Sequence, residues 1–135
     1  MNKEIDNSKL KSDSAHILLI DDEEYLVKLW KRVIENYGYR VTSYTSGIQA
    51  LEHFKNDPDS FNIVITDQSM PEITGFELVE EIVKVRSNMK FIICSGYLGD
   101  IDLKNEMNKH IEIVLLKPFD SNTLMEAIER ALISC

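Results

Sequence analysis

Residues 63–75 read IVITDQSMPEITG, an apolar run followed by a carboxylate and, further on, by Pro71 and Gly75. The first four residues of this stretch are apolar or β-branched, so they predict a short strand, Ile63–Thr66, that is covered on both faces. Asp67 follows this strand directly, and Gly75 lies further along. The stretch therefore predicts a buried strand with a carboxylate at its carboxyl end.

Four more short apolar runs predict strands of the same kind. Between the runs, apolar residues recur at helical spacing, most clearly at Leu124, Ile128 and Leu132. Strand–helix alternation implies a parallel sheet with helices on both faces. We therefore predict an α/β, flavodoxin-like (βα)5 fold, a doubly wound five-stranded parallel sheet with strand order 2-1-3-4-5. The four further strands are His16–Ile20, Arg40–Tyr44, Phe91–Cys94 and Ile111–Leu116.

Several residues predict where helices begin and end. Gly38 is placed to end the first helix, and Ser46 and Thr74 are placed to cap later ones. Weaker apolar patterns predict the helices Ile48–Phe54 and Asp100–Lys109.

Composition narrows the class of protein. The chain has 135 residues, of which 44% are hydrophobic and 28% charged, an ordinary composition for one globular domain. Lys and Arg number 15 against 23 Asp and Glu, so the formal charge is −8. This charge argues against direct binding to nucleic acid or to an anionic membrane, and it is compatible with sites for divalent cations.

The first fourteen residues differ from the rest. They are rich in Asn, Lys, Asp and Ser, so they predict a flexible N-terminal tail over 1–14 and a domain over 15–135. They contain no apolar core of a signal peptide, and no apolar run in the chain approaches the ~18 residues of a membrane span. We therefore expect a cytoplasmic location. Cys94 and Cys135 show no metal-ligand spacing.

Some apolar residues have two interpretations. Trp30 and Tyr37 on the first helix are interpreted as core packing. Ile101 and Met125 are candidates for an exposed surface that binds a partner or forms a homodimer, although single surface hydrophobes are common.

Polar residues follow four of the predicted strands. Asp21 and Asp22 come after the first strand, Asp67 after the third, Ser95 after the fourth and Lys117 after the fifth. Because the carboxyl ends of parallel strands meet at one edge, these side chains are expected to converge near the point where the strand order reverses. Close carboxylates repel one another, and Mg²⁺ together with one ammonium relieves that repulsion.

This set of groups suggests a reaction. A carboxylate beside Mg²⁺, a lysine and a hydroxyl can attack a phosphoryl group and form an aspartyl phosphate. In such a transfer Lys117 would hold phosphoryl oxygens, and Ser95 would donate a hydrogen bond to another.

At these residues the sequence resembles the receiver domain of two-component response regulators. The resemblance spans essentially all of residues 15–135, and it includes Met70, Pro71 and Gly75 at fixed distances after Asp67. The matching pieces are ILLIDDEE at 17–24, IVITDQSMPEITG at 63–75, FIICSGY at 91–97 and LLKPF at 115–119.

The resemblance implies a role for each matching residue. Asp67 matches the phosphoacceptor, and Asp21 and Asp22 match the acidic pair that holds Mg²⁺. The main-chain carbonyl of Ser69 matches a further Mg²⁺ ligand.

Two residues of the receiver pattern contact the phosphoryl group. Lys117 matches the phosphate-contacting lysine, and the Lys117–Pro118 bond is expected to be cis. Ser95 matches the hydroxyl that swings onto the phosphoryl group. The sequence departs from the pattern at Val114, where many receivers carry an aromatic switch residue.

The resemblance also implies a function and partners. It implies Mg²⁺-dependent transfer of a phosphoryl group from a phosphohistidine, on a histidine kinase or histidine phosphotransferase, to Asp67. The transfer would switch the face built from the fourth helix, fifth strand and fifth helix. No output domain is expected in this chain, so it resembles a stand-alone receiver or the receiver of a hybrid sensor kinase. No enzymatic activity is implied beyond self-phosphorylation and autodephosphorylation.

Two other functions remain open. A Mg²⁺-dependent phosphatase with an aspartate nucleophile is one, but haloacid-dehalogenase-like enzymes carry a second Asp where this chain has Ser69. A scaffold that acts without phosphorylation is the other, although this chain retains Asp21, Asp22 and Asp67. Nucleotide binding is disfavoured, because no glycine-rich phosphate loop is present.

Overall fold

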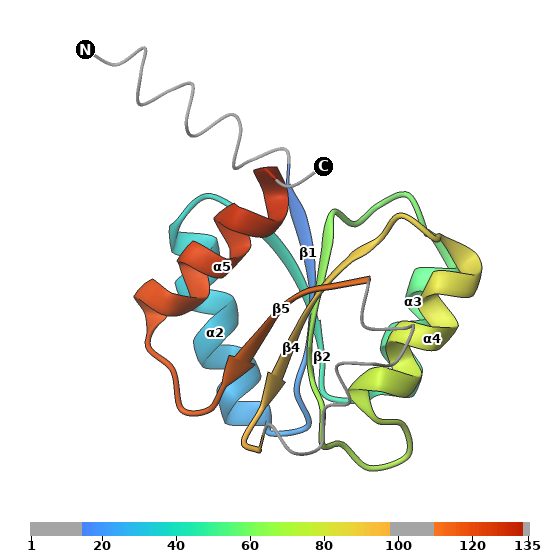
Figure 1. Ribbon diagram of the computed structural model, residues 1–135, viewed down its shortest axis with the longest axis horizontal. Helices are drawn as coiled ribbons and strands as arrows, with labels where there is room; N and C mark the ends of the chain where they lie inside the picture. Colours follow the sequence, from blue (N-terminus) through green and yellow to red (C-terminus); the bar gives the residue numbers. More distant parts are fainter. Residues whose placement is uncertain (1–14, 98–109, 134–135) are drawn as a thin grey trace.

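The five strands form one parallel sheet in the order β2-β1-β3-β4-β5, which confirms the flavodoxin-like prediction (Figure 1). The computed structural model describes residues 15–97 and 110–133. The expected tail, 1–14, and the expected helix Asp100–Lys109 lie outside the described residues. The strands are β1 (His16–Ile20), β2 (Arg40–Tyr44), β3 (Ile63–Asp67), β4 (Lys90–Ser95) and β5 (Ile111–Leu116). The helices are α2 (Glu24–Asn36), α3 (Gly47–Asn56), α4 (Gly75–Val85) and α5 (Ser121–Ile133).

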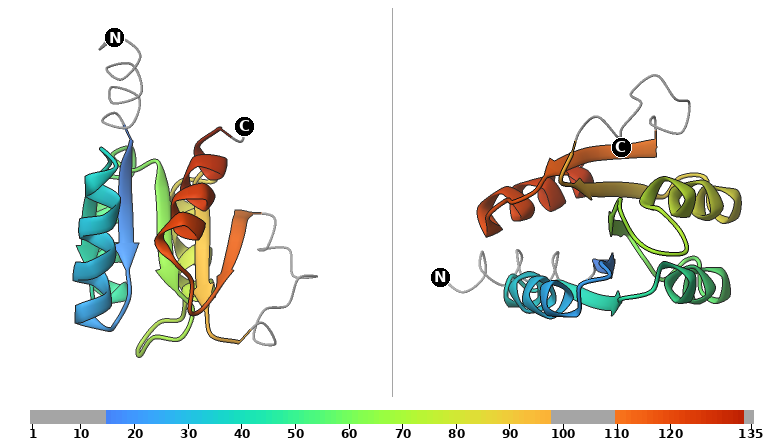
Figure 2. Two further views of the ribbon diagram at one scale, coloured as in Figure 1. Left: turned by 90° about the vertical axis from the view of Figure 1, so that its left-hand side faces the viewer. Right: turned by 90° about the horizontal axis from the view of Figure 1, so that it is seen from below.

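Helices cover both faces of the sheet. Helices α2 and α5 lie on one face, and α3 and α4 lie on the other (Figures 1 and 2). In β3, Ile63 and Ile65 pack into the cluster under α2 and α5, while Val64 packs into the cluster under α3 and α4. This double burial explains why the strand is continuously apolar rather than alternating. Within the described residues, no helix is long and apolar enough to cross a membrane.

Local signals in the sequence set the helix ends. Gly38 has a φ of 98°, and its N–H donates to the carbonyl of Glu35 at 2.9 Å, which ends α2. Ser46 caps α3 with its hydroxyl. Thr74 caps α4 in a reciprocal pair of hydrogen bonds with Glu77. All three predicted helix ends are therefore confirmed.

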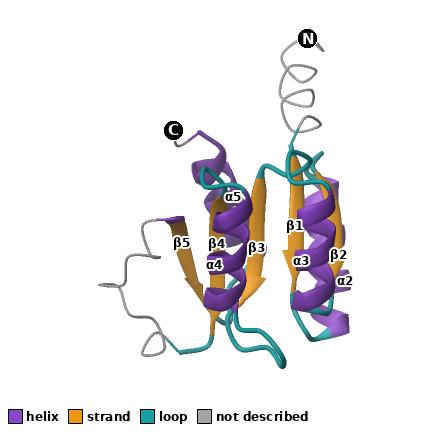
Figure 3. Cartoon of the chain, turned by 90° about the vertical axis from the view of Figure 1, so that its right-hand side faces the viewer, coloured by secondary structure: helices purple, strands orange, loops and turns teal. Residues whose placement is uncertain are grey.

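Two strands end one residue later than predicted. Asp67 is the last residue of β3 and pairs with Cys94, and Ser95 is the last residue of β4 and pairs with Leu116. A polar side chain does not interrupt a parallel ladder, because only the backbone makes the ladder bonds. Asp67 and Ser95 are therefore held by the sheet itself rather than by a loop. Figure 3 shows the carboxyl ends of the strands meeting at one edge.

Two interpretations of apolar residues are wrong. Met125 is only 6% exposed, because it belongs to the apolar face that α5 turns to the sheet. Tyr37 is 51% exposed, because it caps α2 and lies beyond the helix's last buried turn. Trp30 does pack against the core, as expected. Ile101 lies outside the described residues.

Gly75 is required by a close approach between α4 and β3. A Cβ at Gly75 would lie 2.7 Å from the carbonyl oxygen of Asp67 and 2.9 Å from Oε1 of Gln68. Gln68 is buried, and its Oε1 accepts a hydrogen bond from the backbone N–H of Phe76 at 2.9 Å. The N–H of Gly75 also donates to the carbonyl of Gln68 at 3.0 Å. The first turn of α4 therefore holds the backbone directly after Asp67.

We expect Gly75→Ala to lower the free energy of unfolding by about 1–3 kcal/mol, since the backbone oxygen of Asp67 has to shift to admit a methyl group. Denaturant unfolding measures the change. Gly96→Ala is the matched control, because a Cβ at Gly96 would meet nothing within 4 Å. Equal effects of the two substitutions would contradict this account of Gly75.

His16 connects β1 to its neighbours at the amino end of the sheet. Its Nδ1 lies 3.1 Å from the carbonyl oxygen of Ser60, and its Nε2 lies 2.7 Å from Oγ1 of Thr42. A carbonyl only accepts, so Nδ1 carries the proton, and a neutral ring accepts from Thr42 through Nε2. Burial, together with the positive charge of Arg40, lowers the pKa of His16 below its ordinary value of 6.5.

The lowered pKa predicts a pH dependence of stability. The folded state disfavours the protonated ring, so the unfolded state binds the proton first on acidification. The contribution of His16 is present above its ordinary pKa of 6.5 and is lost as the pH falls through the lower folded value. We expect the free energy of unfolding in urea to fall more steeply for the native chain than for His16→Gln between roughly pH 7.5 and roughly pH 5. Parallel pH profiles would contradict the assignment.

Candidate functional site

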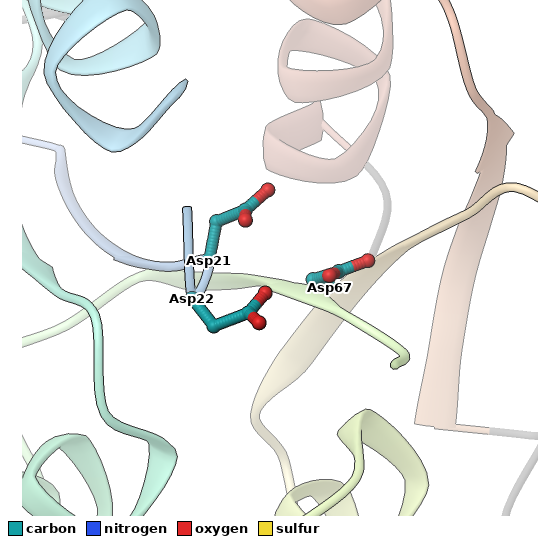
Figure 4. A group of neighbouring side chains, drawn as sticks. All are labelled: Asp21, Asp22 and Asp67. Carbon is teal, nitrogen blue, oxygen red and sulfur yellow. The ribbon is translucent and has the colours of Figure 1, made fainter. Parts of the chain in front are cut away.

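Three carboxylates meet at the carboxyl edge of the sheet. Asp21 and Asp22 follow β1, and Asp67 ends β3, the neighbouring strand (Figure 4). One oxygen from each lies within 4.8 Å of the others. Asp21 and Asp67 are buried, with 6% and 7% exposure, while Asp22 is exposed. We call these three residues the acidic pocket.

Lys117 brings a positive charge to the acidic pocket. Its Nζ lies 3.2 Å from Oδ2 of Asp21 and 3.1 Å from Oδ1 of Asp67. Burial on its own would lower the pKa of Lys117, yet the two carboxylates outweigh it and raise the pKa above its ordinary value. The ammonium therefore stays charged and joins residues that are far apart in the chain.

The charge of the acidic pocket is only partly balanced. Burial raises the pKa of Asp67, and the carboxylates of Asp21 and Asp22 raise it further, while Lys117 opposes the shift. The net direction is upward, so the single ammonium does not fully offset burial and repulsion around Asp67. A further positive charge would stabilise the ionised form.

Backbone contacts hold the site in place. The Oδ1 of Asp21 accepts a hydrogen bond from the N–H of Glu23 at 2.9 Å, which ties the carboxylate to the start of α2. The N–H of Lys117 donates to the carbonyl of Ser95 at 2.8 Å. The Lys117–Pro118 peptide bond is cis, as expected.

The two serines of the predicted site are placed differently from the carboxylates. The Ser95 hydroxyl donates to the carbonyl of Tyr97 at 2.9 Å and accepts from its N–H at 3.1 Å. Ser95 thus closes a turn within its own segment, although it ends the strand beside Asp67. Ser69 is exposed in the loop that follows β3. The structure therefore brings Asp21, Asp22, Asp67 and Lys117 together, with both serines on the adjoining segments.

From the sequence, neither Trp30 nor Phe119 was placed at the site. A cavity of about 10 Å³, roughly the space of one water molecule, is lined by Asp21, Asp67 and Lys117 together with Trp30 and Phe119. The rings of Trp30 and Phe119 are stacked, with centroids 5.1 Å apart. Cys94 also lines this cavity, and burial raises the pKa of its thiol to about 12, so it remains a neutral thiol.

The donor set of the acidic pocket fits a hard divalent cation. All three side chains offer carboxylate oxygens, and these lie close enough together to share one ion. Mg²⁺ is bound in proteins through few carboxylates and keeps several waters, which suits a pocket with one exposed member.

The chain is thus an α/β domain of the flavodoxin-like class, in which three carboxylates and a lysine meet at the carboxyl edge of the sheet around Asp67. More particularly, the chain belongs to the family of response regulator receiver domains, because the model of that family matches residues 17–129. The resemblance inferred from the sequence is therefore confirmed.

Two curated relatives show how this domain is used in longer proteins. The sensor kinase CckA of Brucella abortus (strain 2308) is 32% identical over 130 residues, which are 96% of this chain and 14% of the kinase. The response regulator SaeR of Staphylococcus aureus (strain USA300) is 30% identical over 118 residues, which are 87% of this chain and 50% of the regulator. The chain thus spans half or less of these relatives.

Solved structures share the fold over nearly their whole length. A response regulator receiver domain protein from Clostridium thermocellum has a TM-score of 0.81 at 32% identity, over 87% of this chain and 94% of that one. The response regulator TrrA from Thermotoga maritima, solved in complex with Mg²⁺–BeF, has a TM-score of 0.76 at 27% identity. That match covers 87% of this chain and 99% of TrrA.

Replacing Lys117 tests the charge balance. In buffer without divalent cations, we expect Lys117→Met to lower the free energy of unfolding by about 1–3 kcal/mol, less than for a fully buried pair because the side chain is 26% exposed. The same variant should bind Mg²⁺ more tightly than the native chain, since the pocket becomes more negative. Denaturant unfolding and titration calorimetry measure the two effects.

Lys28→Met is the control for a lost lysine. Lys28 pairs with Glu24 at 3.2 Å on the exposed surface of α2, where both side chains are more than 70% exposed, at 75% and 72%. Its replacement should change stability by less than ~0.5 kcal/mol and leave Mg²⁺ binding unaltered. Weaker Mg²⁺ binding by Lys117→Met would contradict the electrostatic account.

Proposed function

We propose that this chain is a phosphoacceptor that depends on Mg²⁺, and that Asp67 is the residue phosphorylated. The observation that carries the proposal is the position of Asp67, which ends a central strand among two other carboxylates and 3.1 Å from the ammonium of Lys117. Membership of the receiver family supports the same function. We assign residues 15–135 as the receiver domain, acting in the cytoplasm.

The acidic pocket would hold the metal. Asp21, Asp22 and Asp67 would bind Mg²⁺ with carboxylate oxygens, and Ser69 would add its main-chain carbonyl. When bound, Mg²⁺ would neutralise charge on the pocket and on the phosphoryl oxygens. The related TrrA was solved in complex with Mg²⁺–BeF, which supports Mg²⁺ binding by the present chain.

The transfer itself exchanges one bond to phosphorus for another. A carboxylate oxygen of Asp67 attacks the phosphorus of a phosphohistidine, the phosphorus–nitrogen bond breaks, and the imidazole leaves with the electron pair and takes up a proton. Lys117 would hold a phosphoryl oxygen through its ammonium. Ser95 would donate to another oxygen, and for this its hydroxyl has to leave the carbonyl of Tyr97, which it contacts at 2.9 Å.

The phosphohistidine donor would be a histidine kinase or a histidine phosphotransferase. Sensor kinases and response regulators both contain this domain among the relatives, so the chain would act as one step of a two-component phosphorelay. Phosphorylation would switch the surface around β5 and α5. We also propose that two copies of the chain can form a homodimer through this surface.

The alternative functions make different predictions. A phosphatase would turn over phosphate monoesters many times, but its general-acid aspartate would be replaced by Ser69, which is exposed in the loop after β3. A scaffold that needs no phosphorylation would have no use for the partly unbalanced charge around Asp67. Labelling that stops after one phosphoryl group and depends on Mg²⁺ would favour the phosphoacceptor over both alternatives.

Phosphorylation can be tested without a kinase. After incubation with acetyl phosphate and Mg²⁺, we expect intact-mass spectrometry to find one added phosphoryl group on the native chain and none on Asp67→Asn. Glu81→Gln is the matched control, because Glu81 lies on the surface of α4 in an exposed pair with Lys84 at 2.9 Å. It should be labelled like the native chain. Equal labelling of Asp67→Asn would sink the assignment.

A further inference from the structure

The rings of Trp30 and Phe119 form a stacked pair directly beneath the acidic pocket. Their centroids are 5.1 Å apart and their planes are inclined by 23°. Trp30 lies on α2, and Phe119 lies between β5 and α5. Both rings line the same small cavity as Asp21, Asp67 and Lys117. The aromatic pair and the charged groups are therefore neighbours around a common space.

The pair belongs to a closed circuit of contacts. Lys117 joins the segment after β5 to Asp21 at 3.2 Å. Asp21 in turn is tied to the start of α2 by its hydrogen bond with the N–H of Glu23. Further along α2, Trp30 stacks on Phe119, which lies two residues after Lys117. The same two segments are thus joined twice, once by an ion pair and once by stacked rings.

Helices α2 and α5 lie side by side on the face that carries this pair (Figures 1 and 2). Trp30 and Phe119 are partly buried and pack against the same apolar cluster. A cavity of about 10 Å³ between the rings and the carboxylates leaves room for a small displacement of either side. A change at Lys117 can therefore reach α2 without disrupting the rest of the core.

Val114 has no aromatic ring that could respond to a change at Lys117. It lies within β5, pairs with Ile93 and is partly buried. Phe119 provides a ring on the other side of Lys117 in the chain, and that ring already has an aromatic partner.

We propose that Trp30 and Phe119 are positioning residues for Lys117, and that their stacked rings transmit the state of the acidic pocket to helix α2. The inference rests on the proposed function, because it assumes that cation and phosphoryl group change the contacts of Lys117. New charges at the pocket draw the ammonium away from Asp21, and the segment 117–119 moves with it. The stacked rings then shift, and the displacement of Trp30 moves helix α2.

Trp30 makes the test direct, because it is the single tryptophan of the chain. Its emission is recorded while Mg²⁺ is added alone and then together with beryllofluoride. We expect a change in intensity with each addition for the native chain. Phe119→Leu should lose most of the emission response to beryllofluoride, because the ring that couples the segment 117–119 to Trp30 is gone. Phe119→Tyr, which retains the ring, should restore that response.

A control variant separates stacking from general loss of core packing. Phe76→Leu removes a partly buried ring from the cluster on the opposite face of the sheet. It should lower stability while keeping the native emission response and the native Mg²⁺ affinity. If Phe119→Leu responds like Phe76→Leu, the pocket acts on Trp30 through space and the proposal is overturned.

Labelling by acetyl phosphate, followed by intact-mass spectrometry, separates a failure of the phosphoacceptor function from a failure of the role of the stacked rings. A native chain that gains no phosphoryl group contradicts the phosphoacceptor function itself. A native chain that is labelled at Asp67 but shows no change in Trp30 emission leaves that function standing and refutes the role of the stack. Labelling together with a response that depends on the ring at residue 119 supports both.

Discussion

The contact of Lys117 with Asp21 and Asp67 is the interaction on which the rest of the site depends. The carboxyl ends of parallel strands lie at one edge of the sheet, so the side chains at the ends of neighbouring strands lie close together. Three carboxylates and one ammonium leave two negative charges in excess. Burial raises the pKa of Asp67, and Lys117 offsets this rise only in part, while Asp21 and Asp22 add to it. A divalent cation has the charge that would balance the cluster. The geometry and the electrostatics of the site therefore both support the Mg²⁺ dependence that we propose.

The remainder of the fold serves to hold that cluster in place. Asp67 is anchored on two sides, by pairing with Cys94 in β4 and by the approach of Gly75 at the start of α4. Gln68 fixes the distance between β3 and α4, because its buried amide oxygen binds the N-terminal turn of that helix. Asp67 therefore lies on a rigid strand, while Asp22 and Ser69 lie in exposed segments that can adjust to a ligand.

Much of this arrangement could be predicted from the sequence, because it follows from local patterns and strand order. The apolar runs predicted the strands, and the polar residues that followed them predicted that Asp67 and Lys117 converge at one edge of the sheet. The burial of Met125 was missed because one helical stripe does not show how wide the covered face is. The stack of Trp30 on Phe119 was also missed, since it joins residues 89 positions apart and depends on how α2 and α5 settle on the sheet.

The two links between α2 and the segment after β5 differ in what they respond to. The ion pair of Lys117 with Asp21 responds to any charge that enters the acidic pocket, whereas the stack of Trp30 on Phe119 is apolar and responds only to displacement. Coupling requires an element with more than one arrangement that both sites can bias. We propose the segment 117–119 as that element, because it carries one member of each link and lines the small cavity. This chain has Val114 where many receivers have an aromatic residue. In the mechanism that we propose, a charge that enters the acidic pocket instead displaces the packed rings of Trp30 and Phe119 next to it.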